Sequence, residues 1–306
     1  MKKGKSGKAR IGVIMGGLSS EREISLLSGA AIVKELKSRG ENAVAIDLNG
    51  RSVKKIEKAG IDVAFIALHG TGGEDGVIQG ILEFLGIPYT GSGVLASAIG
   101  MNKVKTKEIL AFNKIPTAAW QVMYGREEVA ELKIKYPIVF KPVSEGSSVG
   151  VYIVKNEKEA LKYFSTARKY GPVLAEEFIS GKEITVPVFG GRTLPIIEIV
   201  AANEFYDYES KYTAGMSNHI IPARITPAES MLAQKTALKV HECVGCRDYS
   251  RVDMIVSGGK VCVIEINTLP GMTSLSLFPD AAKKAGIPFY EMIMTLVNCA
   301  LSRSEK

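Results

Sequence analysis

The chain has 306 residues and a formal net charge of +7, and no apolar run in it approaches the roughly 20 residues that a membrane span needs. Its composition is that of a soluble globular protein with two or three domains. The basic residues 1–10 precede only a short apolar strand, which excludes a signal peptide, so we expect a cytoplasmic protein.

The positive charge is compatible with nucleic-acid binding, with an anionic substrate, or with a solvated basic surface. Beyond the first ten residues, Lys and Arg are spread along the chain, and no recognised nucleic-acid-binding motif is present. We therefore expect neither nucleic acid nor a membrane as a partner.

The first third of the chain alternates strands and helices. Strands are predicted over residues 10–15, 43–47 and 62–68, and helices over residues 21–39 and 76–85. This alternation predicts a doubly wound parallel sheet, on which ligands bind beyond the carboxyl ends of the strands. Gly16-Gly17 and the run from His69 to Gly73 both follow strands, so we expect both at that edge.

The remaining two thirds predict mixed α+β structure. Strands are expected over residues 137–141, 151–154, 173–177, 184–189, 194–200, 250–256 and 261–266. Helices are expected over residues 103–112, 156–170, 227–242, 275–285 and 288–301. The polar, Tyr-rich stretch 205–220 has no regular pattern and predicts a long functional loop.

The four cysteines include the pair Cys243 and Cys246, a spacing found in redox and zinc sites. A tetrahedral zinc site needs four ligands, and only His241 adds a third here. We therefore expect the pair to serve packing. Cys262 and Cys299 lie in apolar runs, which predicts core positions.

The segment FKPVSEGSSVGV places Lys141 at the end of a strand and a Gly/Ser-rich loop, residues 144–150, directly after it. Glycine lets backbone N–H groups turn toward an anion, and serine hydroxyls add donors. A phosphate cradle and an ordinary hairpin loop are both compatible with this pattern.

The segment VLAEEFISGKEITV ends one strand at Glu176 and Glu177 and begins the next at Glu183. Carboxylates at strand ends can accept hydrogen bonds from ribose hydroxyls, and exposed backbone there can bind an adenine edge. Taken alone, the segment favours a charged loop.

The segment SRVDMIVSGGKVCVIEINTLPG carries the strongest signal. Val261, Val263, Ile264 and Ile266 predict a buried strand, which the turn at Ser257-Gly258-Gly259 joins to the preceding strand as a hairpin. Because side chains alternate along strands, Asp253, Glu265 and Asn267 should converge on one face. Oxygen ligands of this kind suit Mg²⁺ bound to triphosphate, with Arg251 nearby, while a structural Arg–carboxylate network is the alternative.

Eight segments, taken in their order along the chain, resemble the ATP-grasp superfamily and, more closely, the D-alanine–D-alanine ligase family. They are GGLSSEREISLLSG (16–29), IALHGTGGEDGVIQG (66–80), PYTGSG (88–93), MNKVKTK (101–107), KPVSEGSSVGV (141–151), FYDYESKY (205–212), RVDMIV (251–256) and EINTLPGMTSLSLFP (265–279). The resemblance implies an N-terminal doubly wound parallel α/β domain followed by an ATP-grasp pair of α+β domains. The implied domains are residues 1–100, 101–183 and 184–306, the last with a mobile loop at 205–220.

The resemblance also implies a reaction, in which two D-alanines are joined with ATP through an acyl phosphate, and a role for each site residue. Catalytic roles fall to Glu21, Ser147, Tyr212, Arg251 and Gly271, the last two as the oxyanion hole. The amino acids would be bound by His69, Ser276 and Leu277 as well as Glu21. ATP would be bound by Lys103, Lys141, Lys211, Glu176, Glu177, Phe178, Ile179 and Glu183. Asp253, Glu265 and Asn267 would hold two Mg²⁺ ions, with Mn²⁺ as a substitute, and the family implies a homodimer.

Three alternatives remain open. Within the family, a D-alanine–D-lactate or D-alanine–D-serine ligase is the nearest, although Tyr212 after Lys211 resembles the dipeptide-forming type. A dinucleotide-binding oxidoreductase would need G-x-G-x-x-G after the first strand, which GGLSSE lacks. A non-enzymatic basic binding protein would leave the polar groups at Glu265 and Asn267 unexplained.

Overall fold

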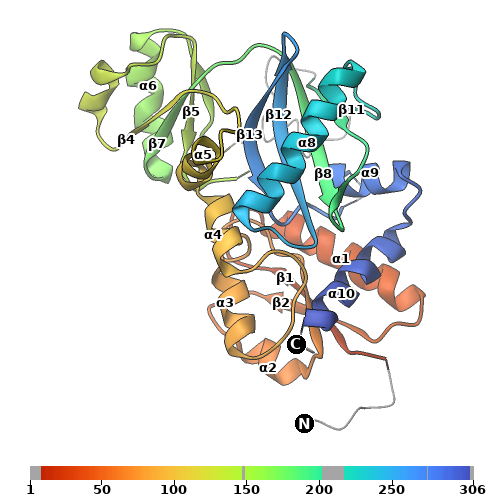
Figure 1. Cartoon of the computed structure of the whole chain (residues 1–306). Coiled ribbons are helices and arrows are strands. Elements are labelled where there is room, and N and C mark those ends of the chain that lie inside the picture. The colour runs from red at the N-terminus through yellow and green to blue at the C-terminus, as the bar shows by residue number, and fades with distance from the viewer. Residues whose placement is uncertain (1–7, 147–148, 202–216, 274, 304–306) are drawn as a thin grey trace. The chain divides into compact units, whose positions relative to one another are not determined.

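The computed structural model describes residues 8–146, 149–201, 217–273 and 275–303 (Figure 1). Contacts within the chain define two compact units. The first comprises Met1–Val94, Arg247–Tyr249 and Leu269–Lys306, and the second comprises Leu95–Cys246 and Ser250–Thr268. The C-terminal helices thus group with the N-terminal sheet, and the predicted domain borders at 100/101 and 183/184 stay a prediction.

The first unit is built on a parallel sheet in the order β2-β1-β3. Its elements are β1 (Ile11–Gly16), α1 (Arg22–Ser38), β2 (Ala43–Leu48), α2 (Lys54–Ala59), β3 (Val63–Ile66), α3 (Val77–Phe84), α9 (Leu277–Lys284) and α10 (Phe289–Arg303). Helix α1 packs on β1 and β2, and α10 packs on β3 and α1. Every residue of β1 and β3 is buried, which is typical of parallel strands, and the predicted parallel α/β fold is confirmed.

The second unit contains two sheets. The first is antiparallel, in the order β4-β7-β5-β6. The elements in this part are α4 (Val94–Met101), α5 (Lys103–Phe112), β4 (Trp120–Met123), the 3₁₀ helix η1 (Arg126–Glu131), β5 (Ile138–Pro142), β6 (Tyr152–Val154), α6 (Glu157–Ala167), the 3₁₀ helix η2 (Arg168–Tyr170) and β7 (Val173–Glu177). Helix α6 packs on β5 and β6, where Phe140, Val154 and Phe164 share one apolar core.

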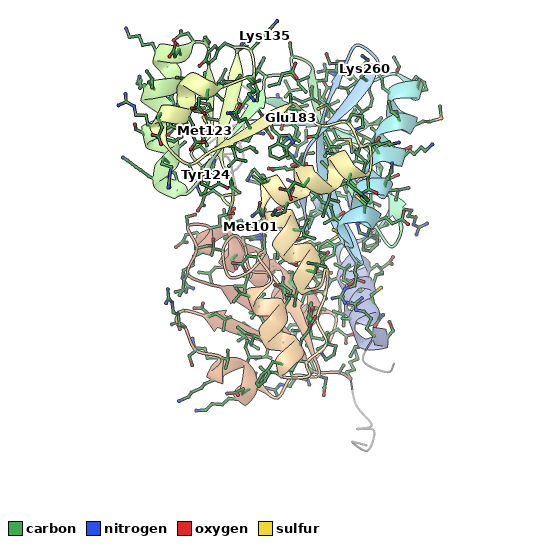
Figure 2. All side chains as sticks on the ribbon, turned by 60° about the vertical axis from the view of Figure 1, so that its left-hand side comes forward. Met101, Met123, Tyr124, Lys135, Glu183 and Lys260 are labelled. Carbon is green, nitrogen blue, oxygen red and sulfur yellow. The ribbon has the colours of Figure 1, made fainter. Side chains whose placement is uncertain are left out.

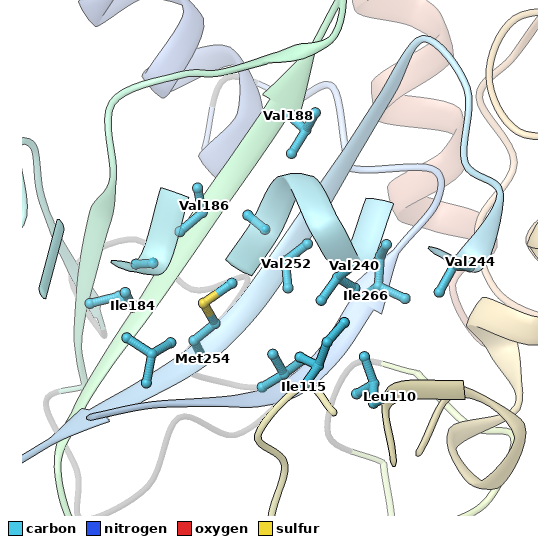
Figure 3. Packing of buried hydrophobic residues seen from close by; sticks show 14 of the residues in the cluster. Leu110, Ile115, Ile184, Val186, Val188, Val240, Val244, Val252, Met254 and Ile266 are labelled. Atoms are coloured by element: carbon cyan, nitrogen blue, oxygen red, sulfur yellow. The ribbon is translucent and has the colours of Figure 1, made fainter. Parts of the chain in front are cut away.

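The second sheet has six strands, in the order β11-β10-β8-β12-β13 with β9 beside β8. Its elements are β8 (Lys182–Phe189), β9 (Arg192–Thr193), β10 (Ile197–Ala201), β11 (Ser217–Ile220), α8 (Pro227–Val244), β12 (Tyr249–Ser257) and β13 (Lys260–Asn267). Helix α8 packs on β8 and β13 over a core that includes Val186, Val240, Met254 and Ile266 (Figure 3). The sheets are antiparallel and mixed with helices, as the predicted α+β class requires.

Two of the differences between the predicted segments and the structure concern the strands beside residues 202–216. The strand expected over residues 194–200 begins only at Ile197, because Pro195 has no N–H group to donate to a ladder. The loop expected over 205–220 is wrong at its end, where residues 217–220 form β11 and pair with β10. Residues 202–216 lie outside the described residues.

The hairpin β12–β13 turns at Gly258-Gly259, which both have positive φ, and carries a bulge in β13. Asp253 pairs with Glu265, but the next residue, Met254, pairs with Val263. Ile264 is therefore an extra residue that no residue of β12 opposes.

The bulge changes which side chains share a face. Val261, Val263 and Ile266 are buried in the core, whereas Ile264 and Glu265 face the other way. Strict alternation from Val263 would have turned Glu265 into the core. Because of the extra residue, Glu265 stands opposite Asp253, and Asn267 stands opposite Arg251 on the same face.

No single helix among the described residues is both long and apolar enough to cross a membrane. Helices α9 and α10 reach that length and apolarity only as a pair, and they meet at a bend of 106°.

Candidate active site

Most of the predicted ATP-binding side chains surround one pocket in the second unit. Its walls come from α5, from strands of both sheets, and from the loop after β5. The pocket has a cavity volume of about 120 Å³ and is partly open to solvent. The predicted residues that line it are Lys103, Lys141, Glu176, Glu177, Phe178, Ile179, Glu183, Asp253 and Glu265, of which Glu183 is labelled in Figure 2.

The apolar floor of the pocket was not predicted. It is formed by Val139, Val151, Ile255, Cys262 and Ile264. The prediction that Cys262 is a core residue is wrong, because its position in β13 turns it to the pocket face, opposite Ile255. Burial raises the pKa of the Cys262 thiol to about 11, so it is a neutral, apolar wall at neutral pH.

Lys103 joins the glycine-rich loop to α5. It is the first residue of that helix, whose N-terminus is capped by the Asn102 side chain, which accepts from Lys105 N at 3.1 Å. The Lys103 ammonium donates to the carbonyl oxygen of Glu145, at the start of the loop. Its backbone N–H also donates to Val143 O at 3.0 Å, so helix and loop form one wall.

Glu176 lies between two lysines. Its Oε2 is 2.6 Å from Lys141 Nζ, and its Oε1 is 2.9 Å from the Nζ of Lys107, a buried residue that sequence reasoning missed. Burial alone would raise the pKa of the Glu176 carboxyl, but Lys141 and Lys107 outweigh burial and hold the pKa at about 2. Glu176 is therefore a carboxylate at neutral pH.

The two lysines respond differently to that carboxylate. Burial lowers the pKa of the Lys107 ammonium, and the charge of Glu176 only partly opposes that change. Burial also acts to lower the pKa of the Lys141 ammonium, but Glu176, with smaller effects from Glu265 and Glu183, outweighs it and the pKa is raised. Lys141 is thus a firmly charged cation on the pocket wall.

Asp253 is the centre of a hydrogen-bonded group on the pocket face of β12 and β13. It accepts from Arg251 Nε at 3.0 Å and Nη2 at 2.9 Å, and from Asn267 Nδ2 at 3.0 Å. The hydroxyl of Thr185, on the adjacent β8, also donates to it. The predicted convergence of Asp253, Glu265 and Asn267 on one face is confirmed by the register.

This donor set fits a hard cation. Asp253 and Glu265 supply carboxylate oxygens, and Asn267 supplies an amide that can turn its oxygen outward, which is the chemistry that Mg²⁺ prefers when phosphates complete its shell. No group of three or more His, Cys, Asp and Glu side chains gathers as a metal site in the part of the chain that the structure describes. The cation charge would thus be balanced by two carboxylates and the substrate.

The first unit gathers the residues that the resemblance links to amino-acid binding. Glu21 is buried at the N-terminus of α1, and its Oε2 lies so close to Gly70 that a Cβ there would be 2.8 Å away. Ser19 Oγ donates to His69 O at 2.7 Å and accepts from Glu21 N at 3.2 Å. Glu21 and His69 are thus held together by the turn that precedes α1.

His69 is buried, and its ring is oriented from both sides. Nε2 lies 3.2 Å from Ser28 Oγ, and Nδ1 lies 3.3 Å from Glu74 Oε1. Glu74 was not singled out from the sequence, although its place five residues after His69 in the same loop was a usable signal. The pair fixes the imidazole plane at the carboxyl edge of the parallel sheet.

Gly271 and Ser276 lie beside His69. A Cβ at Gly271 would be 2.8 Å from Ser276 Oγ and 4.0 Å from His69 Cε1. Ser276 is the N-cap residue of α9, yet its hydroxyl bonds Thr273 at N (3.0 Å) and Oγ1 (2.8 Å) instead of capping the helix. The first N–H groups of α9, beginning at Leu277, therefore have no cap from Ser276 and suit a carboxylate ligand.

Three predicted residues, Ser147, Lys211 and Tyr212, lie outside the described residues. Among the cysteines, Cys243 and Cys246 pack against the core beneath α8, as expected. His241 uses Nδ1 to contact Ser250 Oγ at 2.7 Å.

Comparison with known proteins agrees with this geometry. Residues 108–298 match the model of the D-ala D-ala ligase C-terminus, and residues 48–92 match that of the N-terminus. The chain is 49% identical to the D-alanine–D-alanine ligase of Desulforudis audaxviator, covering 96% of this chain and 99% of that protein. It is also 49% identical to that of Geobacter sulfurreducens, covering 93% and 92%.

Solved structures agree as well. The D-alanine–D-alanine ligase of Bacillus anthracis complexed with ATP superposes with a TM-score of 0.85 at 38% identity, covering 98% of this chain and 99% of that one. The enzyme from Coxiella burnetii gives 0.82 at 28% identity, covering 97% and 95%. With the family models matching both ends and relatives near half identity along almost the whole length, this chain is a ligase that belongs to the D-alanine–D-alanine ligase family.

Proposed function

We propose that this chain joins two D-alanines to D-alanyl-D-alanine, cleaving ATP to ADP and phosphate through an acyl phosphate. The observation that supports it most directly is the pocket that Lys103 and Lys141 line together with the carboxylates Asp253 and Glu265. Cations and a pair of carboxylates that can hold a metal ion, in one pocket, suit a polyphosphate that must be held and neutralised.

The first step joins the carboxylate of one D-alanine to the γ-phosphorus of ATP. An O–P bond forms, the bond from that phosphorus to the bridging oxygen breaks, and ADP leaves. Two anions must approach, so Lys103, Lys141 and Lys211 would spread positive charge over the phosphates. Backbone of Phe178 and Ile179 and the carboxylates of Glu176, Glu177 and Glu183 would hold adenine and ribose.

Asp253, Glu265 and Asn267 would hold two Mg²⁺ ions, or Mn²⁺ in their place. When bound, the ions neutralise phosphate charge. Asp253 would then exchange its hydrogen bond from Asn267 for the cation, while Arg251 keeps it oriented.

The amino acids would be bound by groups of the first unit. Glu21 would accept hydrogen bonds from the ammonium of the first D-alanine, with His69 beside its carboxylate. Ser276 and the N–H of Leu277 would hold the carboxylate of the second D-alanine at the start of α9.

The second step is attack of the free amine of the second D-alanine on the acyl carbon. A C–N bond forms and the carbonyl oxygen becomes an oxyanion; the carbonyl then re-forms as the C–O bond to phosphate breaks, and the proton lost by the amine leaves with the phosphate. Arg251 and the N–H of Gly271 would stabilise that oxyanion. Ser147 and Tyr212 would link Glu21 to the segment 205–216, which would shield the acyl phosphate from water.

In the cell, we propose that the enzyme acts in the cytoplasm as a homodimer and that its product enters peptidoglycan precursors. D-alanine and ATP are its partners, with neither nucleic acid nor membrane.

The test is phosphate release from ATP and Mg²⁺ with D-alanine, with L-alanine, and with D-alanine plus D-lactate or D-serine. Release that requires D-alanine and is not accelerated by the other acceptors supports the proposal, together with D-alanyl-D-alanine as the product. Faster release and a mixed product with D-lactate or D-serine would assign the chain to the alternative branch. Release with no dependence on D-alanine would overturn the proposal.

A further inference from the structure

Lys107 is a fully buried lysine, with a side chain 1% exposed, in the middle of α5. A buried ammonium lowers stability unless it is paired, and burial does lower the pKa of this one. Such a residue is rarely present for stability alone, so its contacts indicate what it does.

The ammonium of Lys107 connects three parts of the pocket wall to α5. It lies 2.9 Å from Glu176 Oε1 on β7 and donates to Thr117 Oγ1 at 2.7 Å and to Ala118 O at 3.3 Å. The Thr117 hydroxyl in turn donates to Val263 O, at 2.9 Å, on β13 next to the bulge. One cation thus ties α5, β7 and β13 together behind the pocket.

Lys107 also sits one helical turn after Lys103, so both lie on the same face of α5. Lys103 lines the pocket, and Lys107 lies beneath it. Glu176 Oε1 accepts no hydrogen bond from the described residues. It lies 2.9 Å from the Lys107 ammonium, and the attraction between the two charges holds it there. Oε2 is free to hold the Lys141 ammonium at 2.6 Å.

We propose that Lys107 is a positioning residue for the nucleotide. Its ammonium fixes the carboxylate of Glu176, and through it the ammonium of Lys141, at the pocket wall where both meet ATP. The proposal rests on the assignment of this pocket to ATP. A merely structural ion pair would also lose stability on substitution, but it would leave nucleotide affinity unchanged in the folded protein.

The test compares Lys107→Met with Lys105→Met. Lys105 is on the same helix, is 59% exposed and pairs with Glu108 at 2.8 Å, so its loss controls for removing a lysine from α5. The dissociation constant for Mg·ADP is measured by calorimetry without D-alanine, and the KM for D-alanine is measured at saturating ATP. We expect Lys107→Met to weaken ADP binding by about tenfold, the value of a charge-assisted contact, with an unchanged KM for D-alanine.

The control should bind ADP as the unsubstituted chain does. The proposal would be overturned if a folded Lys107→Met protein bound ADP with an affinity within about twofold of that of the unsubstituted chain, since such a change lies within measurement scatter. Since ADP binding is measured without any reaction, it separates this inference from the proposed ligation: a chain that binds ADP but forms no dipeptide refutes only the latter.

Should Lys107→Met fail to fold, Thr117 provides a milder pair of variants. Thr117→Val removes the hydroxyl that accepts from the ammonium, whereas Thr117→Ser keeps it. We expect weaker ADP binding in Thr117→Val only. Equal affinity in the two folded variants would overturn the proposal.

Discussion

Arg251 and Asp253 form a bidentate ion pair along one face of β12, with Nε to Oδ1 at 3.0 Å and Nη2 to Oδ2 at 2.9 Å. Both side chains are largely buried, at 14% and 7% exposed. The guanidinium therefore holds the carboxylate in one orientation before any cation arrives, which is the arrangement that a metal ligand requires.

Asp253→Asn should destabilise the chain, because it removes the carboxylate charge that pairs with the largely buried Arg251 guanidinium. We expect the free energy of unfolding to fall by about 3 kcal/mol. Urea unfolding followed by circular dichroism measures it. An unchanged midpoint would show that solvent replaces the carboxylate at no cost.

Glu265→Ala should separate metal binding from stability, since the Arg251–Asp253 pair stays intact. We expect Mg²⁺-dependent turnover to fall by at least about 100-fold, as for loss of one electrostatic group at a reacting phosphate. Thermal unfolding should stay near that of the unsubstituted chain. Near-normal turnover over a full Mg²⁺ titration would remove Glu265 from the metal site.

Gly70→Ala should disturb Glu21 directly, because the new Cβ would lie 2.8 Å from its Oε2. Gly72→Ala is the matched control: its φ of +85° brings similar left-handed strain to the +66° of Gly70, but a Cβ there meets nothing within 4 Å. We expect a raised KM for D-alanine in Gly70→Ala alone. Equal effects in both variants would assign the loss to backbone strain.

Glu176→Gln should change how stability depends on pH. The folded pKa of Glu176, about 2, lies below its ordinary value of 4.5, so the carboxylate contributes stability above pH 4.5 and loses it as the pH falls toward 2. The difference in unfolding free energy between the unsubstituted chain and the variant should therefore shrink between pH 4.5 and 2. Urea titrations at several pH values measure it; a constant difference would mean that Glu176 does not titrate there.

Arg303→Ala tests the C-terminal helix. Arg303 pairs with the buried Asp248 at 2.5 Å and donates to Tyr89 O at 2.7 Å. Removing it takes the ion pair from a carboxylate that is 6% exposed and keeps the hydrogen bond from Gly91 N at 2.8 Å, so we expect a loss of about 3 kcal/mol in unfolding free energy. Lys105→Ala, at an exposed ion pair, should cost below about 1 kcal/mol. Equal losses of unfolding free energy in the two variants would show that the Arg303–Asp248 pair contributes no more stability than an exposed ion pair.

Much of the fold followed from local pattern. The buried runs at β1 and β3 and the helical period of α5 gave their elements within a residue or two, since long-range contacts reinforce those preferences. The short helices α2 and α4 were missed. They have only six and eight residues, and such lengths depend on packing more than on periodicity.

Site residues could be predicted where the local sequence pattern indicates them. They could not be predicted where their role depends on contacts between distant segments. Lys141 and Glu183 lie near strand ends, and Asp253 lies on the alternating face of β12 with Arg251, so their type and position indicated a ligand. Lys107 gave no such signal, because its partners Thr117 and Glu176 are brought to it only by the tertiary fold. The apolar floor of the pocket could not be predicted either, because its residues come together from separate strands only in the folded chain.

The bulge in β13 also determines where this strand can tolerate a change of length during evolution. Deleting Ile264 would leave Val263 inward and Glu265 outward in plain alternation, so the proposed cation ligands would keep their face with one apolar contact fewer. Inserting a residue after Glu265 would instead turn Asn267 into the core. The strand can thus lose Ile264 and keep the site, whereas an insertion directly after Glu265 would remove the site.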